Sequence, residues 1–206
     1  MLKNIRFYFG YWLLLFCIQS SYGLDDNQSW TSVGFEKKLP YSLKLKFEQE
    51  LRLEDQASTF KQTFSEFSLS YTVFKGFKIE LPFRYMTYKD KTKQRVSFGG
   101  SYKYSFKPVS LKYRIKYQTT YEKGEIPEEL IRNKFSIMYR LNKKIEPYVS
   151  GEFIQLDAQN YPLDETRFSF GFTYELPRKN SMKIFYTLKN EDKTIGIFGL
   201  SYNFSL

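Results

Sequence analysis

The feature that most constrains this chain is a regular alternation of apolar and polar residues that begins near residue 42. In the first segment, 43–53, leucine and phenylalanine fill most odd positions, whereas lysine, glutamate and arginine fill the even ones. A period of two places these sets on opposite faces of a β-strand, while the 3.6-residue period of a helix would scatter both. The chain is therefore expected to be all-β, with strands whose two faces meet different surroundings.

Ten such segments continue to the C-terminus, and the connections between them alternate in length. The segments are 43–53, 67–73, 77–85, 95–106, 109–118, 135–141, 145–153, 168–174, 182–188 and 198–206. Short connections fall at 74–76, 106–108, 142–144 and 177–180, and mostly longer ones at 54–61, 88–93, 122–131, 157–165 and 190–193. Short periplasmic turns and longer outer loops are typical of outer-membrane barrels. We therefore predict a closed antiparallel transmembrane β-barrel of about ten strands (10 to 12), whose even number places both of its ends on one side.

Two parts of the sequence fit this scheme less well. Residues 30–39 are strand-like and lead through Pro40 into the first segment. We therefore expect 24–41 to form either an extra N-terminal strand or a plug-like segment before a barrel that spans 42–206. Pro82 lies inside a segment, where its missing backbone N–H indicates a β-bulge or a displaced strand boundary.

The alternation does not by itself say which face points outward. Roughly fifty large apolar side chains would overfill a closed barrel, because eight strands already enclose only enough space for their own side chains. Apolar residues are therefore expected to face lipid, and charged residues a lumen. The alternative is an exported soluble β-sandwich or β-barrel that buries the apolar face and binds an acidic ligand.

The N-terminal residues 1–23 have the pattern of a cleaved signal peptide. Lys3 and Arg6 precede an apolar run, and cleavage is expected before Leu24. This run is the only stretch that approaches the length of a membrane-spanning helix. Cys17 is the only cysteine, so the exported chain would contain none, and the net charge of +10 would become +8 without Lys3 and Arg6.

The C-terminal segment adds a targeting feature of its own. Tyr202, Phe204 and Leu206 continue the apolar alternation to the last residue. This pattern resembles the signal that outer-membrane barrels present to the barrel-insertion machinery, although that signal usually ends in Phe or Trp.

Three further segments are similar to an uncharacterised family of outer-membrane β-barrel proteins, the domain of unknown function DUF2490. They are Trp30–Leu39, Phe47–Leu53 and Leu130–Phe135. The resemblance extends over the whole mature chain and implies a barrel in the outer membrane. It implies no assigned activity, so it transfers no functional residue.

The chain contains no histidine, which removes most general acid–base schemes and histidine-based metal sites. We therefore expect neither an enzyme of the usual kinds nor a cofactor or a metal site. A carboxylate pair such as Glu48 with Glu50, or Glu80 with Glu152, leaves a carboxylate-based activity open. The simpler expectation is that each of these glutamates pairs with a nearby lysine or arginine.

The predicted lumen face carries more positive than negative charge. Its cations are Lys44, Lys46, Arg52, Lys78, Arg84, Arg95, Lys103, Lys112, Arg114, Lys116, Lys134, Arg140, Arg167, Lys183 and Lys189. Its acids are Glu48, Glu50, Glu66, Glu80, Glu146, Glu152 and Glu175. If water fills the lumen, this excess of positive charge favours anions.

Two roles remain open at this stage for an integral outer-membrane barrel of this kind. One is a narrow, anion-preferring pore for a small anionic solute, and the other is a closed structural barrel whose charges interlock. The lipid bilayer and the barrel-insertion machinery are the expected partners. Nucleic acid is not, because the chain is expected to be exported and no nucleic-acid-binding module is evident.

Overall fold

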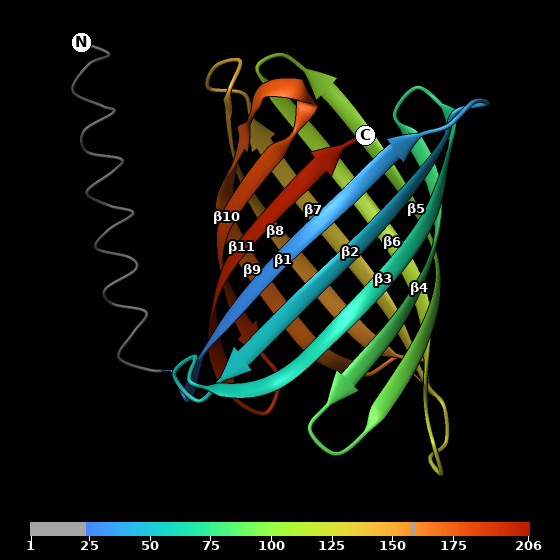
Figure 1. The fold of residues 1–206 in the computed structure, drawn as a ribbon, viewed down its shortest axis with the longest axis vertical. Coiled ribbons are helices and arrows are strands. Elements are labelled where there is room, and N and C mark those ends of the chain that lie inside the picture. The colour runs from blue at the N-terminus through green and yellow to red at the C-terminus, as the bar shows by residue number, and fades with distance from the viewer. Residues whose placement is uncertain (1–23, 158–159) are drawn as a thin grey trace.

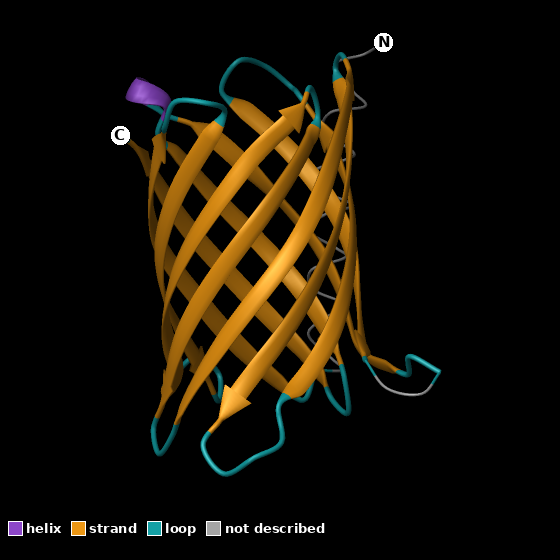
Figure 2. Ribbon diagram, turned by 90° about the vertical axis from the view of Figure 1, so that its right-hand side faces the viewer, coloured by secondary structure: helices purple, strands orange, loops and turns teal. Residues whose placement is uncertain are grey.

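The computed structural model describes residues 24–157 and 160–206, which form a barrel of eleven strands (Figures 1 and 2). The predicted signal peptide, 1–23, lies outside the described residues. The strands are β1 Asp26–Lys38, β2 Leu43–Glu54, β3 Thr59–Phe74, β4 Phe77–Tyr88, β5 Thr92–Phe106, β6 Val109–Glu122, β7 Glu128–Tyr139, β8 Ile145–Leu156, β9 Leu163–Glu175, β10 Ser181–Asn190 and β11 Thr194–Ser205. A 3₁₀ turn, η2 (Pro177–Lys179), lies between β9 and β10. In the described part of the chain, no helix is long and apolar enough to cross a membrane.

Each strand pairs with its neighbours in sequence, and β1 pairs with β11 to close the barrel. Ten of the eleven junctions are antiparallel, as the alternation predicted. The eleventh, between β1 and β11, is parallel, with Asp26 opposite Ile195 and Glu36 opposite Ser205. The strand count of eleven lies within the predicted range.

The odd number of strands corrects the expectation that the barrel begins and ends on one side. Asp26–Lys38 forms a full strand of the wall, so the wall begins at β1 and not at residue 42. Adding one strand to ten makes the first and last strands run in the same direction, so they pair in parallel. In Figure 1 the arrowheads of β1 and β11 accordingly point to the same end of the barrel.

The two ends of the barrel differ in their connections. We call the end with connections 39–42, 75–76, 107–108, 140–144 and 176–180 the turn end. The loop end carries 55–58, 89–91, 123–127, 157–162 and 191–193. The strands run further toward the loop end than the alternating segments indicated, because Glu128 and Leu163 already belong to paired strands.

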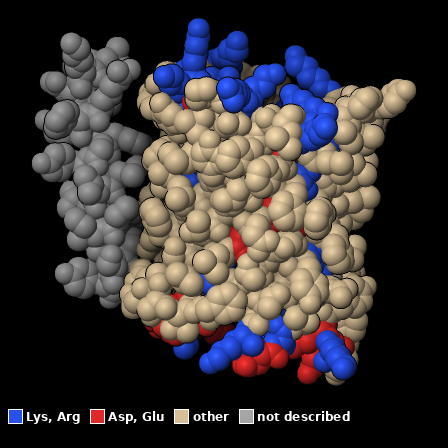
Figure 3. Space-filling view, in the orientation of Figure 1, with Lys and Arg blue, Asp and Glu red and all other residues tan. Residues whose placement is uncertain are grey.

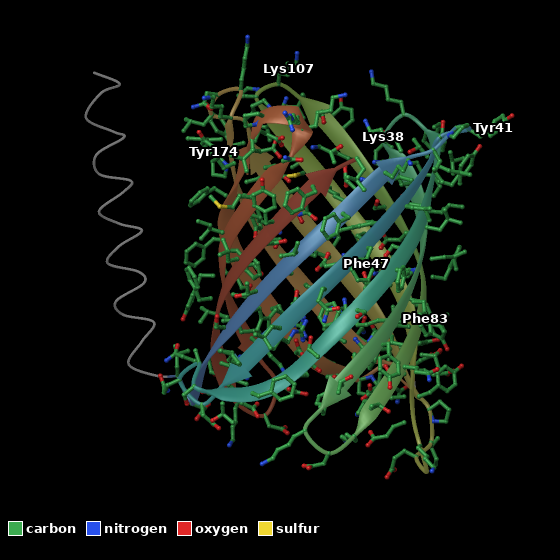
Figure 4. The ribbon with its side chains drawn as sticks, in the orientation of Figure 1. Lys38, Tyr41, Phe47, Phe83, Lys107 and Tyr174 are labelled. Carbon is green, nitrogen blue, oxygen red and sulfur yellow. The ribbon has the colours of Figure 1, made fainter. Side chains whose placement is uncertain are left out.

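The outer surface is a continuous apolar belt around the barrel. Phe67, Phe98 and Phe135 each leave more than half of their surface exposed. Figure 3 shows one side of this belt as a mainly uncharged surface between two charged rims, and Figure 4 shows Phe47 and Phe83 on it, between the ends. A belt of this size in water would be strongly unfavourable, so it identifies the lipid-facing surface. A single closed sheet with its apolar side outward also excludes the two-layer sandwich.

Pro82 is accommodated without the bulge that its position indicated. The β4–β5 register is the same on both sides of it, because Glu80 pairs with Gly99 and Phe83 with Val96. Pro82 itself lies opposite Ser68 of β3. Pro82 has no backbone N–H to donate, so β4 does not pair with β5 at this residue. The register of the two strands does not shift.

Candidate functional site: the charged lumen

Contacts between strands that are not neighbours in the wall define the inner face. Arg114 of β6 reaches Glu152 of β8 at 2.8 Å, and Lys116 of β6 reaches Glu80 of β4 at 3.2 Å. Such contacts cross the interior, and every second residue of a strand shares that face. The same alternation places the other predicted lumen residues on the inner side, with Arg140 and Glu175 at the turn-end mouth.

Most of the inward glutamates are held by a basic partner. Glu50 lies 2.6 Å from Arg52, and Glu66 lies 2.7 Å from Arg84. Other pairs are Lys44–Glu36 at 2.8 Å, Arg140–Glu146 at 3.1 Å, and Lys46–Glu48. The candidate catalytic carboxylates Glu48, Glu50, Glu80 and Glu152 thus each lie in an ion pair. Among the residues of 24–157 and 160–206, no group of three or more acids is arranged to hold a metal ion.

Arginine side chains stack on two inward aromatic rings in the same part of the lumen. The guanidinium carbon of Arg52 lies 3.6 Å from the centre of the Trp30 ring and 5.2 Å from that of Phe64. Arg84 lies 3.7 Å from the Phe64 ring, and Arg167 reaches Trp30 at 5.4 Å from β9. Cation–π contacts of this kind strengthen when water is excluded. They join β1, β2, β3, β4 and β9 across the interior.

The loop-end half of the lumen is packed by inward apolar residues. Phe64, Met86, Leu130, Ile154 and Ile197 are 6% exposed or less, and each lies in the half of its strand nearest the loop end. Of these side chains, Phe64 lies against Arg52 and Arg84. We call this packed region, together with the stacked Trp30 and Arg52, the constriction.

The turn-end half of the lumen is lined by lysines. Of the fifteen predicted lumen cations, six form no ion pair within the described ranges: Lys78, Arg95, Lys103, Lys112, Lys134 and Lys183. Lys78, Lys103, Lys112 and Lys183 are near the turn ends of their strands, and Lys134 is near the middle of β7. Lys183 lies 4.4 Å from the ring centre of Tyr148. Positive charge without a carboxylate partner is therefore concentrated in this half.

A cavity of about 510 Å³ opens in the lysine-lined half. Its lining includes Lys75, Lys78, Lys103 and Lys112, with Ser101 and Ser105 between them. Lys103, Ser101 and Ser105 come from the inner face of β5, while the other lysines come from the β3–β4 turn, β4 and β6. The lumen thus has an open basic compartment at one end and the constriction toward the other.

At the loop end the charges are mixed. Glu122 binds Lys91 at 2.6 Å and Lys93 at 2.8 Å. The hydrogen bond to Glu122 raises the pKa of the Lys91 ammonium above its usual value. Among the described residues, Arg95 is the one inward cation without an ion pair near the loop end of its strand, so this half has less uncompensated positive charge than the turn-end half.

Several lumen residues were not identified from the sequence. Arg132 shares Glu152 with Arg114, at 2.9 Å, and Glu165 is buried between Arg167 and Lys189, with Lys189 at 3.3 Å. Arg132 lies before the predicted segment 135–141, and Glu165 lies within the predicted connection 157–165. Extending the alternation backward from Phe135 and from Phe168 would have placed both residues on the inner face. Trp30 and Phe64 could not be recognised as lumen residues in this way, because aromatic residues are not expected on the polar face of a strand.

The fold and the charged lumen define a class: a closed transmembrane barrel of porin-like architecture. Among solved structures, it is similar to the NanC porin, with 11% sequence identity over 79% of this chain and 86% of that chain and a TM-score of 0.53. It is also similar to the KdgM porin, with 14% identity over 78% and 84% and a TM-score of 0.50. At such identities the likeness concerns the fold. No curated protein matches the chain in sequence.

The sequence family is more specific. Residues 27–196 match the model of the family described as "Protein of unknown function (DUF2490)". The chain belongs to this family, as the resemblance of its segments implied. The match begins within β1 and ends in β11, so β1 is part of the family domain.

Proposed function

We propose that this protein is an integral outer-membrane barrel that acts as a narrow, anion-preferring channel. The observation that carries the proposal is the set of six inward cations, five of them lysines, that form no ion pair with any other described residue. In an aqueous lumen, this excess of positive charge lowers the energy of an anion relative to that of a cation. The two solved structures with a similar fold are named as porins, which supports a channel over other roles for a barrel.

The width of the lumen sets the expected conductance. Eight strands enclose space that their own side chains fill, whereas porins of 16 to 18 strands hold a wide aqueous channel. Eleven strands lie between these cases, and the constriction narrows the lumen further. We therefore expect small, well-separated conductance steps after reconstitution into a planar bilayer.

The experiment is a reversal-potential measurement across a salt gradient in that bilayer. The proposal requires discrete steps and a reversal potential of the sign given by anion flow. A matched variant, Lys112→Gln with Lys134→Gln, should move the reversal potential toward zero without abolishing the steps. Cation-selective steps would contradict the proposal.

A second role is supported by a specific observation, the packing of the constriction. Ile197 and Met86 are almost fully buried, and Arg52 and Arg84 beside Phe64 are paired, which supports a lumen without a continuous water path. A closed structural barrel would give no conductance steps in the same bilayer, although the protein inserts. The single measurement thus separates the two roles.

The proposed location in the outer membrane rests on export of the chain and on its C-terminal strand. Phe204 and Tyr202 face outward in β11, and their rings lie 4.5 Å apart. We propose that they, with Leu206, form the signal that the barrel-insertion machinery binds, after a signal peptide has directed the chain across the inner membrane. Replacing Phe204 and Leu206 by serine should lower the amount of protein in isolated outer membranes, whereas the same change at Leu163 and Ile126 in the loop-end region should not. An unchanged amount after the first substitution would contradict the proposal.

A further inference from the structure

The cavity at the turn end has the composition of a binding site for an anion. Its volume of about 510 Å³ falls within the roughly 300–1,000 Å³ that small-molecule sites commonly have. Lys75, Lys78, Lys103 and Lys112 line it, and the hydroxyls of Ser101 and Ser105 add donors. We call this cavity the lysine vestibule.

The lysines of the vestibule are not neutralised by the protein. None of the four forms an ion pair within the part of the chain that the structure describes. The carboxylates whose charge reaches Lys78 and Lys112 are Glu36 and Glu80. Each of these is already bound elsewhere, Glu36 to Lys44 at 2.8 Å and Glu80 to Lys116 at 3.2 Å. Four ammonium groups around one cavity repel one another unless an anion lies between them.

The charges of the barrel ends favour approach of an anion from the turn end. None of the five turn-end connections contains an aspartate or a glutamate, whereas each of the five loop-end connections contains at least one. In Figure 3 the turn-end rim is accordingly blue and the loop-end rim is mixed red and blue, and Figure 4 shows Lys38 and Lys107 at the turn end. Such an asymmetric field steers anions toward the basic end.

The constriction lies toward the loop end of the lumen, on the far side from the turn end. A ligand that enters from the turn end therefore meets the lysines before it meets the packed apolar residues Met86 and Leu130. The lining residues of the vestibule lie at and beside the turn end, so we expect a ligand to enter from there.

We propose that the lysine vestibule binds a compact multivalent anion of the pyrophosphate type, which enters from the turn end. A monovalent anion would leave most of the ammonium groups uncompensated, whereas the oxygens of two linked phosphates accept hydrogen bonds from several lysines at once. Lysine binds phosphate as a point charge and needs no planar geometry, so four flexible side chains suit a compact ligand. The inference rests on the proposed preference for anions but not on conduction.

The test is titration calorimetry of the purified full chain in a neutral detergent, with inorganic pyrophosphate as the ligand. Sodium chloride keeps the ionic strength constant, so that unspecific screening is the same throughout. Saturable binding near one equivalent is expected. The double variant Lys78→Gln/Lys112→Gln should weaken it by about tenfold or more, because each ammonium supplies a charge-assisted hydrogen bond. The matched control Lys89→Gln/Lys123→Gln removes two loop-end lysines and should change it less than twofold.

The outcomes separate this inference from the proposed channel. Equal weakening in both double variants would overturn it, because the effect would then report net charge alone. Absence of saturable binding in a protein that conducts anions would also overturn it and leave the channel intact. Binding in a protein that shows no conductance would support the vestibule and contradict the channel.

A lipid headgroup offers the same phosphate chemistry, so one arm of the test uses short-chain phosphatidylglycerol. Free phosphate compounds should compete with pyrophosphate for the vestibule, while the lipid should not displace it because its acyl chains prefer the detergent. Displacement by the lipid at equal concentration would overturn the proposal of a soluble ligand.

Discussion

Arg132 Nη2 lies 2.9 Å from Oε1 of Glu152, in the interior where β7 and β8 meet. Arg114 reaches the same oxygen from β6 at 2.8 Å. One nearly buried carboxylate therefore holds two guanidinium groups from different strands. A group of this kind joins the inner faces of β6, β7 and β8 only while all of its members are charged and paired.

Replacing Glu152 by glutamine should destabilise the barrel strongly. The change leaves Arg114 and Arg132 without their shared anion, and breaking a buried pair typically costs about 3–5 kcal/mol. Urea unfolding in detergent or lipid measures the difference. The control is Glu146→Gln, whose partner Arg140 has 60% of its side chain exposed and should cost less than about 1 kcal/mol. Equal losses in both variants would contradict the role given to Glu152.

Much of this arrangement could be predicted from the sequence, because a period of two assigns each residue of a strand to one of its two faces. Glu152 and Arg114 were placed on the inner face in this way. Arg132 and Glu165 were missed because the predicted segments 135–141 and 168–174 begin later than β7 and β9 do. The alternation at a strand end cannot show where pairing stops, since that depends on the neighbouring strand.

The position of β1 illustrates a different limit. Residues 30–39 have the pattern of a strand, but a strand and a plug-like segment share the same local pattern. Only long-range pairing decides between them, and here β11 supplies the partner, with Trp30 opposite Gly199 and Ser32 opposite Ser201. The inward position of Trp30 and Phe64 could not be predicted from their own segments either. It depends on the arginines from other strands that stack on their rings.

Deleting residues 24–41 should prevent the barrel from closing. Without β1, the edges of β2 and β11 lose their partners, including the 2.8 Å hydrogen bond between Ser32 and Ser201. Heat-modifiable migration on a gel, which intact barrels show, should disappear. Removing residues 124–126 from a loop-end connection should leave it in place. A deletion that still migrates as a compact form would mean that the other ten strands close by themselves.

A charged side chain on the outer belt should destabilise the barrel far more than the same side chain at the next residue, which lies on the inner face. Phe135 faces outward with 56% of its surface exposed, whereas Ser136 faces the lumen. Phe135→Lys should cost about 2–4 kcal/mol in a bilayer, the value for a lysine on the lipid face near the midplane. Ser136→Lys should cost clearly less, because the lumen face is polar and a flexible lysine can extend away from Lys112, the residue opposite it. Comparable unfolding free energies for the two variants would contradict the assignment of faces.

Widening the constriction should raise the conductance of the proposed channel without reversing its selectivity. Phe64 is 2% exposed and supports both Arg52 and Arg84 through cation–π contacts. Phe64→Ala removes the ring, so the two arginines lose a packing surface while their glutamate partners remain. We expect larger single-channel steps together with a loss of roughly 2–4 kcal/mol of stability, close to the cost of a phenylalanine truncation in a core. Phe67→Ala is the matched control, because Phe67 lies on the outer face of the same strand, with 59% of its surface exposed. It should leave the step size unchanged, and an equal change in both variants would show that Phe64 does not limit the lumen.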